Sequence, residues 1–302
     1  MAAAARPRPD SLTVWKLAVR LPTLTASVTP VIVGSAVAIR EDVFDLLPAL
    51  AALFAAVCLQ VAANLANDVF DFKRGADTVG TRLGPPRASS SGWLTARQLF
   101  AAMWTAVGLA FLAGIYLTYV GGWPIVVVGL VSIVAAIGYT GGPFPLAYHG
   151  LGDAAAFFFF GIVAVAGAYY VQAEEISGLA LLAGVPVGCT VTAILVVNNL
   201  RDIAGDRLAR KWTLAVLFGD RLTRAWYALL IATAYGVAIV AIVAGERPWL
   251  AAVVLVSIPA AVGPLRGVLT GTTGPALNPL LKATARLNLV LGLSFAVALA
   301  AS

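Results

Sequence analysis

The sequence predicts an all-α polytopic membrane protein with about nine transmembrane helices. Of its 302 residues, 61% are hydrophobic and only 11% are charged, whereas soluble domains carry about 25% charged residues. Apolar runs long enough to cross a bilayer recur along the whole chain. The net charge of +6 does not indicate nucleic-acid binding, because the basic residues lie in alternate loops between these runs and form no soluble patch.

Each expected helix is an apolar run bounded by polar or charged residues. In chain order the runs are 21–39, 46–67, 97–118, 123–140, 153–171, 178–199, 223–243, 248–265 and 283–301. Pro30 and Pro186 fall inside two of them, where neighbouring helices of a bundle satisfy the freed backbone groups. We therefore expect one integral membrane domain over residues 1–302, surrounded by membrane lipid.

Positively charged side chains set the expected orientation. With the N-terminus in the cytoplasm, only Arg40 and Arg247 of the 20 Lys and Arg residues face outward, as the positive-inside rule requires. The two longest polar loops, roughly 68–96 and 200–222, then both lie inside. The expected location is the cell (inner or plasma) membrane, with the N-terminus and both long loops cytoplasmic.

Charge appears abruptly where two of the apolar runs end. Asn67 and Asp71 close one run, and Asn198 and Asp202 close another. A spacing of four residues keeps each pair on one face of a helix. The second motif repeats the first, so the sequence predicts a two-fold internal repeat of a four-helix unit. The repeat halves are roughly 15–150 and 151–270, and 283–301 is a final helix.

Oxygen-bearing side chains from both motifs are expected at one membrane face. Carboxylates suit Mg2+, which fills its remaining positions with water and phosphate oxygens. Nearby bases suit an anionic leaving group, and they are Lys73, Arg74, Arg201, Arg207 and Lys211. In an apolar bundle these groups predict a lipid diphosphate substrate. The alternative is that the charges only flank helices and contact lipid headgroups, and the repetition of the motif on one side weighs against it.

These motifs resemble the two signature motifs of the UbiA superfamily of intramembrane aromatic prenyltransferases. They read Asn67-Asp68-x-x-Asp71-x-x-x-Gly75-x-Asp77 and Asn198-Asn199-x-Arg201-Asp202-x-x-x-Asp206. The segments 21–30, 139–153 and 211–216 also resemble the family, and the resemblance is closer to its MenA-type branch, which makes menaquinone precursors. Asp153 stands where that branch usually has Glu, and Arg210 replaces a usual Gly.

The resemblance implies nine helices around a central cavity capped by cytoplasmic loops. It implies Mg2+-dependent transfer of a polyprenyl chain from a polyprenyl diphosphate to an aromatic acceptor. In the MenA branch the acceptor is dihydroxynaphthoate, which loses its carboxylate as the chain is attached.

The resemblance also assigns roles to residues. It implies metal–diphosphate binding by Asn67, Asp71, Asp202 and Asp206, with Asp68 and Asn198 as helpers. It implies diphosphate contacts by Lys73, Arg201 and Lys211. Tyr139 is expected either to face the allylic cation with its ring or to be an interfacial belt tyrosine.

Four further features of the sequence each allow two interpretations. Asp77 either orders the first loop or binds metal, and the segment 85–92 is either a cap over the site or a linker. His149 is expected to be a loop residue rather than an acceptor ligand. The phenylalanine run 157–160 is expected to be core and lipid-facing bulk rather than the wall of a prenyl tunnel.

Other functions stay open on the sequence alone. A transporter is also built from repeats, but motifs at one membrane face argue against alternating access. A non-catalytic scaffold or lipid-binding protein would need neither Asp71 nor Asp202. A related enzyme with another acceptor, such as hydroxybenzoate, homogentisate, a tetrapyrrole or a glycerol lipid, is compatible with the same motifs.

Overall fold

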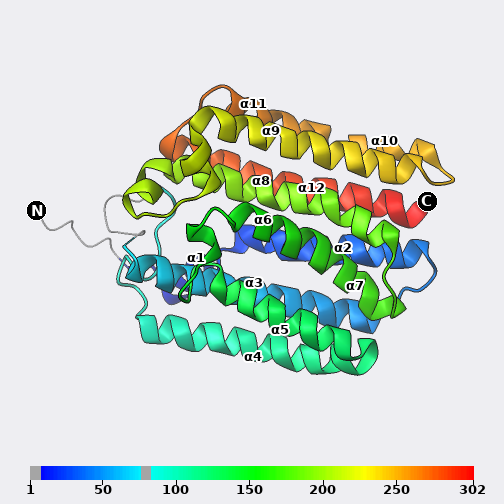
Figure 1. Ribbon diagram of the computed structural model, residues 1–302, viewed down its shortest axis with the longest axis horizontal. Coiled ribbons are helices and arrows are strands. Elements are labelled where there is room, and N and C mark those ends of the chain that lie inside the picture. The colour runs from blue at the N-terminus through cyan, green and yellow to red at the C-terminus, as the bar shows by residue number, and fades with distance from the viewer. Residues whose placement is uncertain (1–7, 76–82) are drawn as a thin grey trace, which may run out of the picture.

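The computed structural model describes residues 8–75 and 83–302, and within them the chain folds as a bundle of helices. The helices lie side by side along one common direction (Figure 1). The single exception to helix and loop in these ranges is an isolated bridge between His149 and Trp212. The predicted all-α class is therefore confirmed.

The first part of the chain supplies five helices and one short 3-10 turn. They are α1 (Ser11–Val19), η1 (Leu21–Leu24), α2 (Thr25–Arg40), α3 (Leu46–Lys73), α4 (Ala96–Gly121) and α5 (Trp123–Gly138). The second part starts with η2 (Leu146–Tyr148), α6 (Gly152–Ala156), the π-helical η3 (Phe157–Val163), α7 (Ala164–Ala173) and α8 (Gly178–Leu208). It ends with α9 (Leu214–Val243), η4 (Pro248–Leu250), α10 (Ala251–Leu255), α11 (Ile258–Leu269), η5 (Gly274–Ala276) and α12 (Leu277–Ala301).

Seven helical segments in the described ranges are long and apolar enough to cross a membrane. Two of them join several labelled elements, namely Ser11–Arg40 (α1, η1 and α2) and Gly152–Ala173 (α6, η3 and α7). An eighth candidate is the pair Pro248–Leu255 and Ile258–Leu269, which is bent by 52°. The helix α5 is apolar but has only 16 residues, which is about 24 Å of helix against about 30 Å of hydrocarbon. A multi-pass membrane protein is thus supported, whereas the count of nine spans and the internal repeat stay predictions.

Polar caps fix where the long helices begin. Thr95 and Gln98 form a reciprocal capping box at the start of α4. Ser177 accepts hydrogen bonds from the first backbone N–H groups of α8, and Thr213 accepts one at the start of α9. Each such cap stabilises a helix by about 1 kcal/mol. The caps hold the ends of the apolar runs at the polar boundary.

The helices that carry the two motifs are longer than a bilayer requires. The helix α3 has 28 residues and α8 has 31, whereas about 20 residues cross the hydrocarbon. Both helices end on the same side of the bundle, at the left in Figure 1. Their last turns, with the motifs, therefore lie at one end of the molecule.

Glycines press η3 against α8. A Cβ added at Gly161 would lie 2.7 Å from both the Gly184 carbonyl oxygen and the Gly188 Cα. Only small residues allow two backbones to come so close inside a membrane. The π-helical η3 directly follows α6, and both elements pack against α8.

Two apolar clusters make up most of the core. The larger one joins α2, α7, α8, α9 and α12, and the smaller one joins α1, α3 and α4 with the segment 88–94. Elements from both clusters line a shared cavity, which contains the candidate site.

Candidate active site

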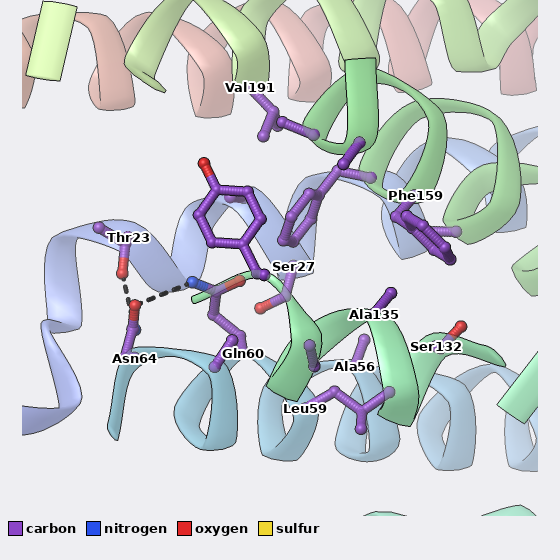
Figure 2. A pocket seen from close by; sticks show the side chains of 18 of the residues that line it. Thr23, Ser27, Ala56, Leu59, Gln60, Asn64, Ser132, Ala135, Phe159 and Val191 are labelled. Atoms are coloured by element: carbon purple, nitrogen blue, oxygen red, sulfur yellow. Dashed lines mark hydrogen bonds between the residues drawn. The ribbon is translucent and has the colours of Figure 1, made fainter. Parts of the chain in front are cut away.

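A cavity of about 830 Å³ lies between the helices. Most of its wall is apolar, and Figure 2 shows Leu59 of α3, Ala135 of α5 and Phe159 of η3 among the side chains that line it. Cavities of this size enclose ligands of several hundred daltons. The apolar wall suits a hydrocarbon chain.

Polar and charged groups gather in one part of this cavity wall. Motif residues there are Asn67 and Asp71 from α3 and Asn198 and Arg201 from α8. Cationic side chains accompany them, namely Lys16, Arg20, Arg87, Lys211 and Lys282. The resulting excess of positive charge suits a polyanionic group such as a diphosphate.

Lys211 joins the two motifs. Its Nζ lies 3.6 Å from Asp71 Oδ2 and 3.9 Å from Asp206 Oδ1. Both carboxylates are largely buried, so the ammonium offsets a charge that would otherwise be costly in this position. One carboxylate from each motif therefore faces the same cationic atom.

Tyr148 holds the other oxygen of Asp71. Its hydroxyl donates a hydrogen bond of 2.9 Å to Asp71 Oδ1. Burial, with the neighbouring Asp71 carboxylate, raises the pKa of Tyr148 above its usual range, so the hydroxyl stays protonated and remains a donor. Arg74 and Lys211 lie over the same ring, at 5.2 and 5.4 Å from its centre.

Arg201 organises the second motif from inside. Its guanidinium donates to Asp202 at 2.9 Å, to Asn198 at 2.8 Å and to Asn278 at 2.8 Å. The Arg201 side chain is 2% exposed. Its donors are therefore largely committed to the protein. Asp202 is 21% exposed and paired with Arg201, and neither Asp202 nor Asp206 is among the residues that line the cavity.

Asp68 faces away from the cavity and anchors the first long loop. Its carboxylate accepts hydrogen bonds from the backbone N–H groups of Ala88 at 3.1 Å and Ser89 at 3.3 Å, and from the Ser89 hydroxyl. The residues Pro85, Pro86 and Arg87 of this loop line the cavity, as a cap over the site would. Asp77 lies outside the described residues.

The remaining sequence-predicted residues divide by position. Tyr139 lines the cavity, and Thr140 donates a 2.7 Å hydrogen bond to Asn67. Lys73 is exposed, with its Nζ 4.8 Å from the centre of the Phe100 ring. His149 is exposed and stacks on Phe144, as expected for a loop residue.

The phenylalanine run is only partly bulk. Phe158 is exposed and Phe157 packs against the larger core cluster, as expected. Phe160 packs against the same cluster but also lines the cavity. The expectation is wrong for Phe159, which lines the cavity.

The cavity wall also carries a polar cluster that we did not predict from the sequence. Asn64 donates to the Val19 carbonyl at 2.8 Å. It also donates to the Thr23 hydroxyl at 2.9 Å, and Gln60 donates to Asn64 at 3.3 Å (Figure 2). Gln60 Oε1 is buried and accepts no hydrogen bond from the described residues. The missed signal is helical spacing, because Gln60, Asn64, Asn67 and Asp71 recur every three or four residues along one face.

The donor set fits a magnesium ion that is shared with a phosphate. No group of three His, Cys, Asp or Glu side chains in residues 8–75 and 83–302 can hold a metal by itself. Mg2+ sites commonly use one or two carboxylates and complete the coordination with water and substrate phosphates. Asp71 and Asp206, placed around one cationic atom, supply such a pair of carboxylates.

Known proteins match this chain along most of its length. The model of the UbiA prenyltransferase family matches residues 27–298. The 1,4-dihydroxy-2-naphthoate octaprenyltransferase of Mycobacterium tuberculosis is 38% identical, over 95% of this chain and 96% of the relative. The enzyme of the same name from Bacillus subtilis is 32% identical, over 94% and 91%.

Solved structures share the fold. A UbiA homologue from Aeropyrum pernix superposes with a TM-score of 0.68 at 18% identity, over 93% of this chain and 97% of that one. A UbiA homologue from Archaeoglobus fulgidus, solved with GPP and Mg2+, gives 0.61 at 13% identity, over 95% and 99%.

Proposed function

The chain belongs to the UbiA prenyltransferase family, and from this premise we propose that it transfers a polyprenyl chain from a polyprenyl diphosphate to dihydroxynaphthoate, with loss of the acceptor carboxylate. The single observation that carries the proposal is the meeting of both motifs on Lys211, which lines an apolar cavity. The relatives with 32% and 38% identity carry the name of this activity and support the choice of acceptor. The product would be a menaquinone precursor.

Diphosphate binding is assigned to the charged end of the cavity. Asp71 and Asp206, with Asn67, Asn198 and Asp202 close by, would hold Mg2+ together with the diphosphate oxygens. When bound, Mg2+ would neutralise charge that develops on the leaving diphosphate. Lys211 faces both carboxylates, and the cavity cations Lys16, Arg20, Arg87 and Lys282 would contact the remaining anionic oxygens. Arg201 would orient the second motif through its hydrogen bonds to Asp202 and Asn198, and Lys73 would contact the diphosphate at the edge of the site.

The apolar part of the cavity would hold the isoprenoid chain. Breaking the bond between C1 and the diphosphate leaves an allylic cation, and water would capture it. The loop 83–89 and the apolar wall exclude water from the reacting carbon. The Tyr139 ring, also in this wall, would stabilise the cation through its π face.

The orientation and the membrane are part of the proposal. The Lys and Arg distribution supports a cytoplasmic position for the end of the bundle with the motifs. Water-soluble acceptor and released diphosphate would then enter and leave on the cytoplasmic side, and the isoprenoid would come from surrounding lipid.

A product assay tests this function. Purified protein in nanodiscs would receive a polyprenyl diphosphate and a panel of aromatic acceptors, with Mg2+ or with a chelator, and mass spectrometry would identify the products. We expect a prenylated, decarboxylated naphthoquinol that requires Mg2+ and disappears in Asp71→Asn and Asp206→Asn.

The control is Asp42→Asn. Asp42 is exposed in the loop that joins α2 to α3 and has a φ of 59°, a conformation that Asn also adopts. Full activity is expected in this variant. Product from a different acceptor would overturn the naphthoate assignment and keep the prenyl transfer. No product from any acceptor, with folded protein and bound donor, would overturn both.

A further inference from the structure

Asp153 is a buried carboxylate in the cavity wall, and diphosphate binding gives it no role. It is 4% exposed and lines the same cavity as Asp71. Its one side-chain hydrogen bond comes from the Trp226 indole N–H, at 3.0 Å from Oδ2. No Lys, Arg or His of the described ranges forms an ion pair with it. Ionisable groups inside a bilayer are costly and mark functional positions.

The protein fixes this carboxylate from several sides. Trp226 belongs to α9, and Thr192 of α8 donates to the Asp153 backbone carbonyl at 3.4 Å. The close contact of Gly161 with Gly184 and Gly188 locks the adjoining η3 onto α8. These contacts leave Oδ1 without a hydrogen-bond donor in the described residues, on a rigid wall of the cavity.

Asp153 also lies beside Tyr139. A Cβ added at Gly152, its neighbour in the chain, would be 3.0 Å from the Tyr139 hydroxyl oxygen. Tyr139 is the residue proposed above to stabilise the allylic cation. A group bound at Asp153 would therefore lie near the position where the new carbon–carbon bond forms.

We propose that Asp153 binds a hydroxyl group of the aromatic acceptor and takes its proton during prenyl transfer. The inference rests on the proposed function and names the group that orients the acceptor. A carboxylate accepts hydrogen bonds and repels anions, so it selects the hydroxyl of the acceptor over its carboxylate. The acceptor carboxylate then points away from Asp153.

Prenyl transfer and decarboxylation with Asp153 as the base need no further reagent. The hydroxyl proton moves to Asp153 Oδ1, and the oxygen pushes an electron pair into the ring. The ring carbon that bears the carboxylate attacks C1 of the prenyl cation, whose bond to diphosphate has broken with the electron pair on the diphosphate. Carbon dioxide leaves, its bonding pair restores the aromatic ring, and Asp153 returns the proton to the oxygen.

The test combines a variant with a modified acceptor. Asp153→Asn keeps an oxygen for the Trp226 N–H but removes the base. We expect it to lower kcat/KM for the acceptor by about 10²–10⁴, the range typical of general base catalysis, with the KM of the prenyl diphosphate unchanged. The wild type should lose activity to a similar extent with the mono-methyl ether of the acceptor that blocks the bound hydroxyl. The two losses should not add, because they remove the same interaction.

Two further variants separate chemistry from structure. Asp153→Glu should recover a large part of the activity, and Trp226→Phe should cost less than Asp153→Asn while it disturbs only the position of the carboxylate. If Asp153→Asn fails to fold, the methyl ether with the wild-type protein and the activity of Asp153→Glu still test the inference.

Three results would overturn the inference. The first is unchanged acceptor kinetics in a folded Asp153→Asn. The second is a loss of prenyl diphosphate binding in that variant as large as its loss in kcat/KM for the acceptor. The third is additivity of the losses caused by the variant and by the methyl ether. Each of them leaves naphthoquinol formation by the wild type untouched, so it does not count against the proposed function. Failure of the wild type to prenylate dihydroxynaphthoate would instead remove the premise.

Discussion

The Asp71 side chain shows how one carboxylate of the candidate site is held. One oxygen accepts from Tyr148, and the other faces Lys211. A rigid carboxylate can meet a cation without reorganisation, which is the condition for electrostatic catalysis. The partners come from two loops, after α5 and after α8, so their effect depends on the tertiary fold.

Tyr148→Phe tests this arrangement. The change removes the hydroxyl donor but keeps the ring under Arg74 and Lys211. A hydrogen bond to a charged group contributes about 1.5–3 kcal/mol, so we expect kcat/KM for the donor to fall about 10- to 100-fold. Steady-state kinetics at several Mg2+ concentrations provide the measurement. The raised pKa keeps Tyr148 protonated at working pH, so the alkaline limb of the pH–rate profile should be the same in the wild type and in Tyr148→Phe. A shift of that limb in the variant would contradict the role of Tyr148 as a hydrogen-bond donor to Asp71.

At residue scale, helical spacing predicted some of the site and not the rest. Asn67 and Asp71 are four residues apart, and both line the cavity, because a spacing of four keeps side chains on one face. Asp68 is about 100° around the same helix from Asn67, so its carboxylate turns to Ala88 and Ser89 instead. Tyr148 and Asp153 carry no periodic signal, since loops and α6 place them.

At the scale of elements, the loop 83–89 is a cap fastened at two points. Asp68 holds Ala88 and Ser89, and Asn278 donates to the Leu83 carbonyl at 2.9 Å. A Cβ at Gly84 would lie 2.8 Å from the guanidinium carbon of Arg201. The cap from the first motif therefore rests directly on the second motif.

Asp68→Ala separates a loop anchor from a metal ligand. Loss of the anchor leaves two buried N–H groups without partners, which costs about 1–3 kcal/mol each and loosens the cap. We expect more hydrolysis of the prenyl diphosphate relative to transfer, with an unchanged midpoint in a Mg2+ titration. Asp71→Ala, the matched variant, should instead abolish turnover at every Mg2+ concentration. A large shift of the Mg2+ midpoint in Asp68→Ala would identify Asp68 as a ligand.

Sequence patterns predicted the long elements better than the broken ones. The predicted run 178–199 lies within α8, because an uninterrupted apolar stretch folds as one helix. The predicted run 248–265 falls on a pair of helices that bends by 52°. The π-helical η3 and the non-helical Gly219 inside α9, with a φ of 75°, are also set by packing rather than by hydrophobic period.

Gly161→Ala probes the contact between η3 and α8. The added methyl would meet backbone atoms of Gly184 and Gly188 at 2.7–2.9 Å, and backbone cannot move aside as a side chain does. We expect a loss of about 1–3 kcal/mol in stability, seen as a lower thermal unfolding temperature, with lower activity because α6 shifts. Gly108→Ala in α4 is the control, since nothing lies within 4 Å of its added Cβ and Gly108 does not line the cavity. Equal unfolding temperatures of the two variants would refute a tight contact at Gly161.

At the scale of the whole molecule, the two ends of the bundle differ in charge and in packing. The motif end has the cavity cations and the cap, whereas the other end has Glu41, which accepts hydrogen bonds from Tyr169 and Ser177. Composition and the positive-inside rule predicted this polarity, because insertion depends on loop charge rather than on tertiary contacts. The way in which α3 and α8 bring Asp71 and Asp206 to Lys211 is a long-range property of the fold, and a single sequence does not contain its geometry.

The proposed orientation leads to a labelling prediction for the intact membrane. Glu175 and Arg210 are both exposed, in the loops before and after α8, and the native Cys58 and Cys189 are buried. In a background that carries Cys58→Ala and Cys189→Ala, a membrane-impermeant maleimide should label Glu175→Cys on intact spheroplasts and Arg210→Cys only in inverted vesicles. Detergent-solubilised samples of both variants should react equally, which controls for local reactivity. Labelling of Arg210→Cys from outside would place the diphosphate site on the opposite face, and donor and acceptor would then have to be supplied from there.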